Sequence, residues 1–99
     1  MRSYENILIF DSTIEEDVVE KELKEIENTI KQTSGEVLSI DKWGKKKLAY
    51  PIKKKDTGYY VLLNLKLERK TLGDLELKYK LNQNILRYSI IRKEENAGV

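Results

Sequence analysis

Lysines gather in one stretch of the chain, at a density that suits contact with phosphate groups. Residues 42–55 hold seven lysines and no acidic residue, arranged around the apolar segment 48–52. So many like charges repel one another, and a polyanion relieves that repulsion. The alternative is a solvated hairpin whose lysines only prevent edge-to-edge pairing of strands. The number of lysines favours the phosphate-binding interpretation; they are Lys42, Lys45, Lys46, Lys47, Lys53, Lys54 and Lys55.

The residue types that most enzymes and metal sites require are missing. The 99 residues include no cysteine and no histidine, which removes disulfides, the usual ligands of zinc, copper and iron, and Ser-His or Cys-His nucleophiles. The five glycines are too scattered for a nucleotide-binding loop. We therefore expect no enzymatic activity, no metal and no cofactor.

The apolar runs and the charge distribution bound the class of protein further. No apolar run approaches the roughly 20 residues that span a bilayer, and the first residues lack an apolar signal segment, so we expect a soluble cytosolic protein. The net charge is only +2, but residues 15–27 hold seven acidic residues. Because the two signs are separated along the chain, we expect an oriented binding surface.

The helices that position these charges are predicted from apolar spacing and end signals. Val19, Leu23, Ile26 and Ile30 recur at helical intervals and predict a helix at about 14–33. A capping box, formed by Thr13 with Glu16 or by Ser12 with Glu15, is expected to begin this helix, and Gly35 to end it. The pair Thr71 and Asp74 is expected to cap a second helix, with Leu72, Leu75 and Tyr79 on its inner face.

Four segments read as strands: 3–10, 36–53, 59–67 and 84–92. The second is expected to bend at Gly44 and to lie at a sheet edge, because Pro51 has no amide hydrogen to donate. The sequence "KDTG", residues 55–58, is a turn signal that would join the second and third strands into a hairpin. We expect Tyr50, Pro51 and the rest of the apolar segment to anchor this hairpin to the domain.

The element order β-α-β-β-α-β predicts an α+β, ferredoxin-like fold. Its four-stranded antiparallel sheet would carry both helices on one face and have the second and fourth strands at its edges. Residues 1–93 are expected to form this single domain, and 94–99 a short flexible C-terminal tail.

The sheet face opposite the helices is not as polar as a solvated face would be. The first and third strands are apolar at both parities, which leaves Ile7, Ile9, Tyr60 and Leu62 as candidate contacts for a protein partner. Single exposed apolar residues are also normal in monomeric proteins, so both interpretations stay open.

The segments "MRSYE", "WGKKKLAYPI", "GYYVLLNL" and "ILRYSIIR" resemble the bacterial small-subunit ribosomal protein six family over about 90 residues. The resemblance implies a structural constituent of the small (30S) ribosomal subunit. It also implies that the protein binds 16S ribosomal RNA together with small-subunit ribosomal protein eighteen, without enzymatic activity or a cofactor. Basic residues at strand ends and edges are the candidate RNA contacts: Arg2, Lys45, Lys46, Lys47, Lys53, Lys54, Arg87 and Arg92.

Two other classes share this element order. An RNA recognition motif stacks bases on aromatic residues of its third strand, but here Val61 and Leu63 occupy positions where further aromatics would be expected. A ferredoxin-like regulatory domain, which binds a small effector or dimerises through its sheet, would leave the lysine cluster unexplained.

Overall fold

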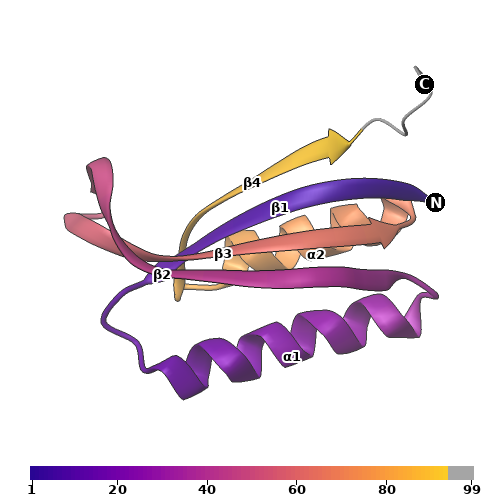
Figure 1. Ribbon diagram of the computed structural model, residues 1–99, viewed down its shortest axis with the longest axis horizontal. Coiled ribbons are helices and arrows are strands. Elements are labelled where there is room, and N and C mark those ends of the chain that lie inside the picture. The colour runs from indigo at the N-terminus through magenta and orange to yellow at the C-terminus, as the bar shows by residue number, and fades with distance from the viewer. Residues whose placement is uncertain (94–99) are drawn as a thin grey trace.

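The computed structural model describes residues 1–93 and has the predicted element order. The elements are β1 (Arg2–Asp11), α1 (Glu16–Gln32), β2 (Glu36–Ile52), β3 (Lys55–Leu67), α2 (Arg69–Leu81) and β4 (Ile85–Lys93). The strands form one antiparallel sheet in the order β2-β3-β1-β4, and both helices cover the same face (Figure 1). The ferredoxin-like fold is confirmed, with β2 and β4 at the edges. The predicted tail, 94–99, lies outside the described residues.

The core lies between the helices and one face of the two central strands. Alternate residues of β1 and β3 are buried, as the pleat of a strand requires. The α1 stripe contributes Val19, Leu23 and Ile30, and α2 contributes Leu75 and Tyr79. Each such side chain stabilises the fold by about 1.5–3 kcal/mol when fully buried. Apolar spacing therefore predicted the inner faces of both helices correctly.

The predicted capping boxes of α1 do not form. The residue before the helix is Glu15, which makes no capping bond. The Thr13 amide and hydroxyl instead both donate to Asp11 Oδ1, at 2.9 and 2.7 Å, and hydrogen bonding to Thr13 lowers the pKa of Asp11. The hydroxyls of Ser12 and Thr57 share a hydrogen bond of 2.7 Å. Thr13 thus bonds locally to Asp11, and Ser12 bonds to Thr57 of β3, so neither side chain caps α1.

The predicted stop of α1 at Gly35 is preceded by a left-handed residue, Ser34. Ser34 has φ 65°, and its amide bonds to the carbonyl of Lys31, while the Gly35 amide bonds to Ile30. This pair of bonds is a Schellman motif. Gly35 is needed for space, because a Cβ there would lie 2.8 Å from Ile30 Cγ2.

The predicted cap of α2 is also wrong, because the helix begins two residues before Thr71. Thr71 is 4% exposed and packs on the inner side of the first turn, while Asp74 lies on the exposed side. A threonine buried on the inner side of a helix cannot serve as its N-cap.

A buried polar contact joins α2 to the two strands beneath it. Asn6 is fully buried on β1, and its Nδ2 donates to the Ser89 carbonyl of β4 at 3.0 Å. The Tyr79 hydroxyl of α2 donates to Asn6 Oδ1 at 2.7 Å. Burial raises the pKa of Tyr79 far above its usual range. Both Asn6 bonds are needed, because an unpartnered polar atom in this core is destabilising.

We predict that Tyr79→Phe lowers the free energy of unfolding by about 1–3 kcal/mol at neutral pH, because Asn6 Oδ1 loses its donor. The wild-type protein should also lose stability above about pH 10, where a tyrosine of the unfolded chain ionises. The folded protein holds this proton more tightly than the unfolded chain, so the contribution is complete below that pH and declines as pH rises.

Chemical denaturation across pH 7–11 measures both effects. Tyr4→Phe is the matched control, because it removes the hydroxyl of another core tyrosine that makes no hydrogen bond within the described residues. Equal stability losses for the two variants would contradict the role given to the Asn6 contact.

Candidate nucleic-acid interface

The β2–β3 hairpin extends beyond the rest of the sheet and curls at its tip. Figure 1 shows this tip at the end of the molecule opposite the N-terminus and the end of β4. The strand register shifts between Lys42 and Gly44, and Gly44 has φ 83°, so the predicted bend at this glycine is confirmed. A bulge of this kind increases local twist and turns the strand out of its plane.

The hairpin turn is made by two lysines and not by the predicted "KDTG" segment. Lys53 and Lys54 have φ values of 50° and 66°, and Ile52 pairs with Lys55 across them. Residues 55–58 belong to β3. Two-residue turns with positive φ match the twist of paired strands, but glycine and asparagine usually occupy them. The chain thus places two exposed lysines at the tip, with a backbone conformation that is strained for residues of this type.

The apolar segment anchors the hairpin less fully than predicted. Leu48 is buried, at 6% exposure, and packs against the backbone at Gly58. Tyr50, in contrast, is 57% exposed, so it does not anchor the hairpin by burial in the core. The curl of the hairpin instead brings Tyr50 to β4, where Arg87 donates to its hydroxyl and lies 5.8 Å from the ring centroid. Tyr50 is therefore a surface residue that fixes Arg87 beside the hairpin.

The seven lysines of this hairpin divide into two groups by their ion pairs. Lys42 pairs with Glu20 of α1, and Lys55 with Asp11 at 3.6 Å. No acidic partner within 4.0 Å is present for the other five among residues 1–93. These five, which we call the lysine ridge, are the ones that the sequence singled out: Lys45, Lys46, Lys47, Lys53 and Lys54.

The three predicted arginines do not lie together. Arg87 joins the ridge through Tyr50, whereas Arg2 and Arg92 lie at the opposite end of a molecule about 40 Å long. There they line a hollow of about 460 Å³ with Arg69, which the sequence reasoning missed. Arg69 is the first residue of α2, whereas a cap at Thr71 predicts a helix that begins three residues later, at 72. The register of β1 with β4 and the correct helix start would have shown this second basic cluster.

The four predicted partner contacts form one continuous patch on the face away from the helices. Ile7 pairs with Leu62 and Ile9 with Tyr60 across β1 and β3, and all four are half-buried. Together with the curled hairpin, part of this patch lines a hollow of about 320 Å³. Ile91 of β4, 55% exposed, is a further apolar residue of this face, paired with Glu5, and was missed. We call Ile7, Ile9, Tyr60 and Leu62 the apolar patch.

The part of the chain that the structure describes shows neither a metal site nor a membrane-spanning helix. Residues 1–93 contain no group of three or more acidic residues arranged to hold a metal ion. Neither of the two helices is long and apolar enough to cross a membrane. The interfaces that remain are the basic surfaces and the apolar patch.

The fold and these surfaces define a ferredoxin-like binding domain. The family model for ribosomal protein S6 matches residues 3–92, and the chain belongs to that family. The small ribosomal subunit protein bS6 of Thermoanaerobacter pseudethanolicus is 42% identical over 95 residues, covering 96% of this chain and all of the relative. The bS6 of Pseudarthrobacter chlorophenolicus is 39% identical, covering 100% and 98% of the two chains.

A solved structure supports the same assignment. The crystal structure of 30S ribosomal protein S6 from Thermotoga maritima superposes with a TM-score of 0.86 at 26% identity, covering 93% of this chain and 87% of that one. The protein is therefore a structural, non-enzymatic constituent of the small ribosomal subunit, and it resides on the ribosome in the cytoplasm. The predicted family, the absence of enzymatic activity and the cytoplasmic location are confirmed.

We predict that replacing Lys53 with Asn and Lys54 with Gly stabilises the isolated protein by about 1 kcal/mol, because these residues adopt positive φ with less strain. Thermal and urea unfolding measure the gain. The control is Lys53→Ala with Lys54→Ala, which removes the same charges and leaves the strain. An equal gain in the alanine variant would show that charge repulsion, not backbone strain, limits stability at the tip.

Proposed function

We propose that this protein binds 16S ribosomal RNA together with small-subunit ribosomal protein eighteen. The lysine ridge contacts RNA phosphates, and the apolar patch contacts the protein partner. The observation that carries the proposal is the division of the hairpin lysines: two are paired with acids, and five project without an acidic partner in the described chain.

The exposure and charge of the lysine ridge suit contact with a polyanion. Its lysines are exposed and occupy one curled hairpin, which Leu48 and the Tyr50–Arg87 contact hold against the domain. Lysines that contact RNA phosphates release condensed counterions, which gives affinity that falls steeply with salt. The strained turn supports a functional role, because Lys53 and Lys54 remain where glycine and asparagine would be more stable.

The apolar patch supports a protein partner. Its four residues are adjacent across two central strands, and the helices already cover the other face of these strands. A second chain that covers the patch would remove this apolar surface from water. A preassembled pair should bind RNA better than either protein alone, because both surfaces are ordered before RNA contact.

The structure disfavours the base-stacking mode of an RNA recognition motif. On the open face of β1 and β3, the central positions are Ile7, Ile9 and Leu62, and Tyr60 is the one aromatic residue. Aliphatic side chains do not provide the row of stacking rings which that mode uses.

We predict that changing Lys45, Lys46 and Lys47 together to Ala weakens binding to a 16S central-domain RNA fragment by at least about 10-fold at low salt. It should also lower the slope of log affinity against log salt by about 2–3, because up to three phosphate contacts are lost. Filter binding at several salt concentrations measures both quantities.

The matched control changes Lys21, Lys24 and Lys31 of α1 to Ala, which removes the same charge from an exposed helix face. This control should keep most of the affinity. If both triple variants bind equally well, net charge and not the ridge determines binding.

We predict that Leu62→Glu weakens association with protein eighteen by at least about 10-fold, because a charged side chain would be buried in an apolar interface. Leu77→Glu is the control, since Leu77 is an exposed leucine on α2. Isothermal titration measures affinity after circular dichroism confirms the fold. Unchanged affinity in folded Leu62→Glu would exclude Leu62 from the interface.

The same proteins test cooperation on RNA. Occupancy of labelled RNA by the two proteins together should exceed the sum of their separate effects, and Leu62→Glu should abolish the excess. Strictly additive binding would contradict the cooperative mechanism. Self-association of this protein in place of heterodimer formation would contradict the assignment of the apolar patch to protein eighteen.

A further inference from the structure

Trp43 forms an aromatic stack at the boundary between the lysine ridge and the apolar patch. Its ring lies nearly parallel to that of Tyr60, with an interplanar angle of 17° and 6.3 Å between centroids. In the register of β2 with β3, Lys42 pairs with Val61 and Gly44 pairs with Tyr60. Trp43 is therefore the extra, unpaired residue of the bulge. The bulge therefore places the indole beside Tyr60.

The indole is fixed in orientation and yet accessible. Its Nε1–H donates to Asp41 Oδ2 at 3.0 Å, and the Tyr60 ring packs against one face of the indole. The side chain remains 40% exposed. A ring that is held in place loses little conformational freedom when a ligand stacks on it.

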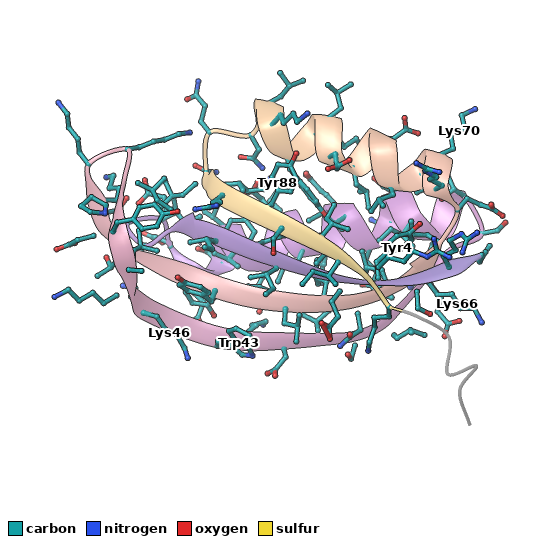
Figure 2. The ribbon with its side chains drawn as sticks, turned by 90° about the horizontal axis from the view of Figure 1, so that it is seen from above. Tyr4, Trp43, Lys46, Lys66, Lys70 and Tyr88 are labelled. Atoms are coloured by element: carbon teal, nitrogen blue, oxygen red, sulfur yellow. The ribbon has the colours of Figure 1, made fainter. Side chains whose placement is uncertain are left out.

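Lys46 occupies a position that a nucleotide could use. Its Nζ lies 5.4 Å from the centroid of the Trp43 ring, and Figure 2 shows the two side chains close together at the β2 edge. An exposed cation–π contact of this kind is weaker than stacking of a base on an aromatic ring. A base can therefore displace the ammonium, which remains near enough to meet the phosphate of the same strand.

The charges around the indole indicate the direction in which a bound nucleic-acid strand would run. Asp41 precedes Trp43 along β2 and repels phosphates, whereas Lys45, Lys46 and Lys47 follow it in the chain, and of these Lys46 lies over the ring. A ligand that suits this arrangement has a flat ring that can stack on the indole. Its phosphates lie on the lysine side of Trp43 and not on the Asp41 side. An unpaired nucleotide of RNA has this chemistry, whereas a base inside a duplex has both faces already stacked.

We propose that Trp43 is a stacking platform for one unpaired base of the bound RNA, with the adjacent lysines on its flanking phosphates. The proposal rests on the proposed RNA-binding function and adds a site that reads single-stranded RNA. The alternative is that the Trp43–Tyr60 pair only stabilises the strand pairing of the hairpin.

Fluorescence tests the platform directly, because Trp43 is the single tryptophan of the chain. Titration with the 16S central-domain fragment should quench its emission over the concentration range in which filter binding shows complex formation. A fully paired RNA duplex of equal length should cause much less quenching at equal occupancy.

Substitutions separate stacking from structure. Trp43→Leu should weaken binding of the fragment by roughly 10-fold at every salt concentration, without changing the salt slope, because stacking releases no counterions. Trp43→Phe retains a ring and should recover most of the affinity. A purely structural pair would instead show lower unfolding midpoints in proportion to any loss of binding.

The outcomes distinguish this proposal from the function on which it rests. Normal fragment binding by folded Trp43→Leu, with no quenching in the wild type, would overturn the platform and leave the RNA-binding function standing. No binding of the fragment by the wild type, with or without protein eighteen, would overturn both. A loss confined to the affinity for protein eighteen would place Trp43 in the protein interface and overturn the platform.

Discussion

The left-handed backbone at Gly44 is the constraint on which the candidate surfaces depend. With φ at 83°, this residue accommodates the bulge that turns β2 out of the sheet plane. A residue with a side chain would be strained there, although no atom would obstruct its Cβ. Beyond the bulge, the hairpin curls until Tyr50 of one sheet edge meets Arg87 of the other. Without that bend, the hairpin would continue in the plane of the sheet, and Leu48, Tyr50 and Ile52 would not line the hollow over the apolar patch.

The fold separates stability from binding. The helices bury one face of β1 and β3, and the Asn6–Tyr79 contact joins three elements within that core. The opposite face of the sheet and the tip of the hairpin, residues 45–57, lie outside this core, so their composition is free to serve partners. Lys42 and Lys55, the two hairpin lysines with acidic partners, tie the hairpin to α1 and to the end of β1. The other five lysines keep their charge available, which is the arrangement that recognition of a polyanion requires.

The spacing of apolar side chains and the order of the elements predicted the fold. The features that they missed depend on competing hydrogen bonds near the helix ends and on the register between distant strands. The α1 stripe and the open-face residues follow from side-chain spacing, and the edge position of β2 follows from the missing amide hydrogen of Pro51. The capping boxes failed because Asp11 competes for Thr13, and the turn was misplaced because lysines at positive φ give no compositional signal. The exposure of Tyr50 and the grouping of Arg2 with Arg69 depend on the hairpin curl and on strand register. No single segment encodes either property.

Lysine reactivity inside the assembled small subunit tests the central claim most directly. Brief acetylation followed by mass spectrometry compares the free protein with native subunits, residue by residue. The account predicts that Lys45, Lys46, Lys47, Lys53 and Lys54 lose most of their reactivity on assembly, while Lys21 and Lys24 on the exposed face of α1 keep theirs. Full reactivity of the ridge in intact subunits, or protection of the α1 lysines in its place, would contradict the assignment of the RNA-binding surface.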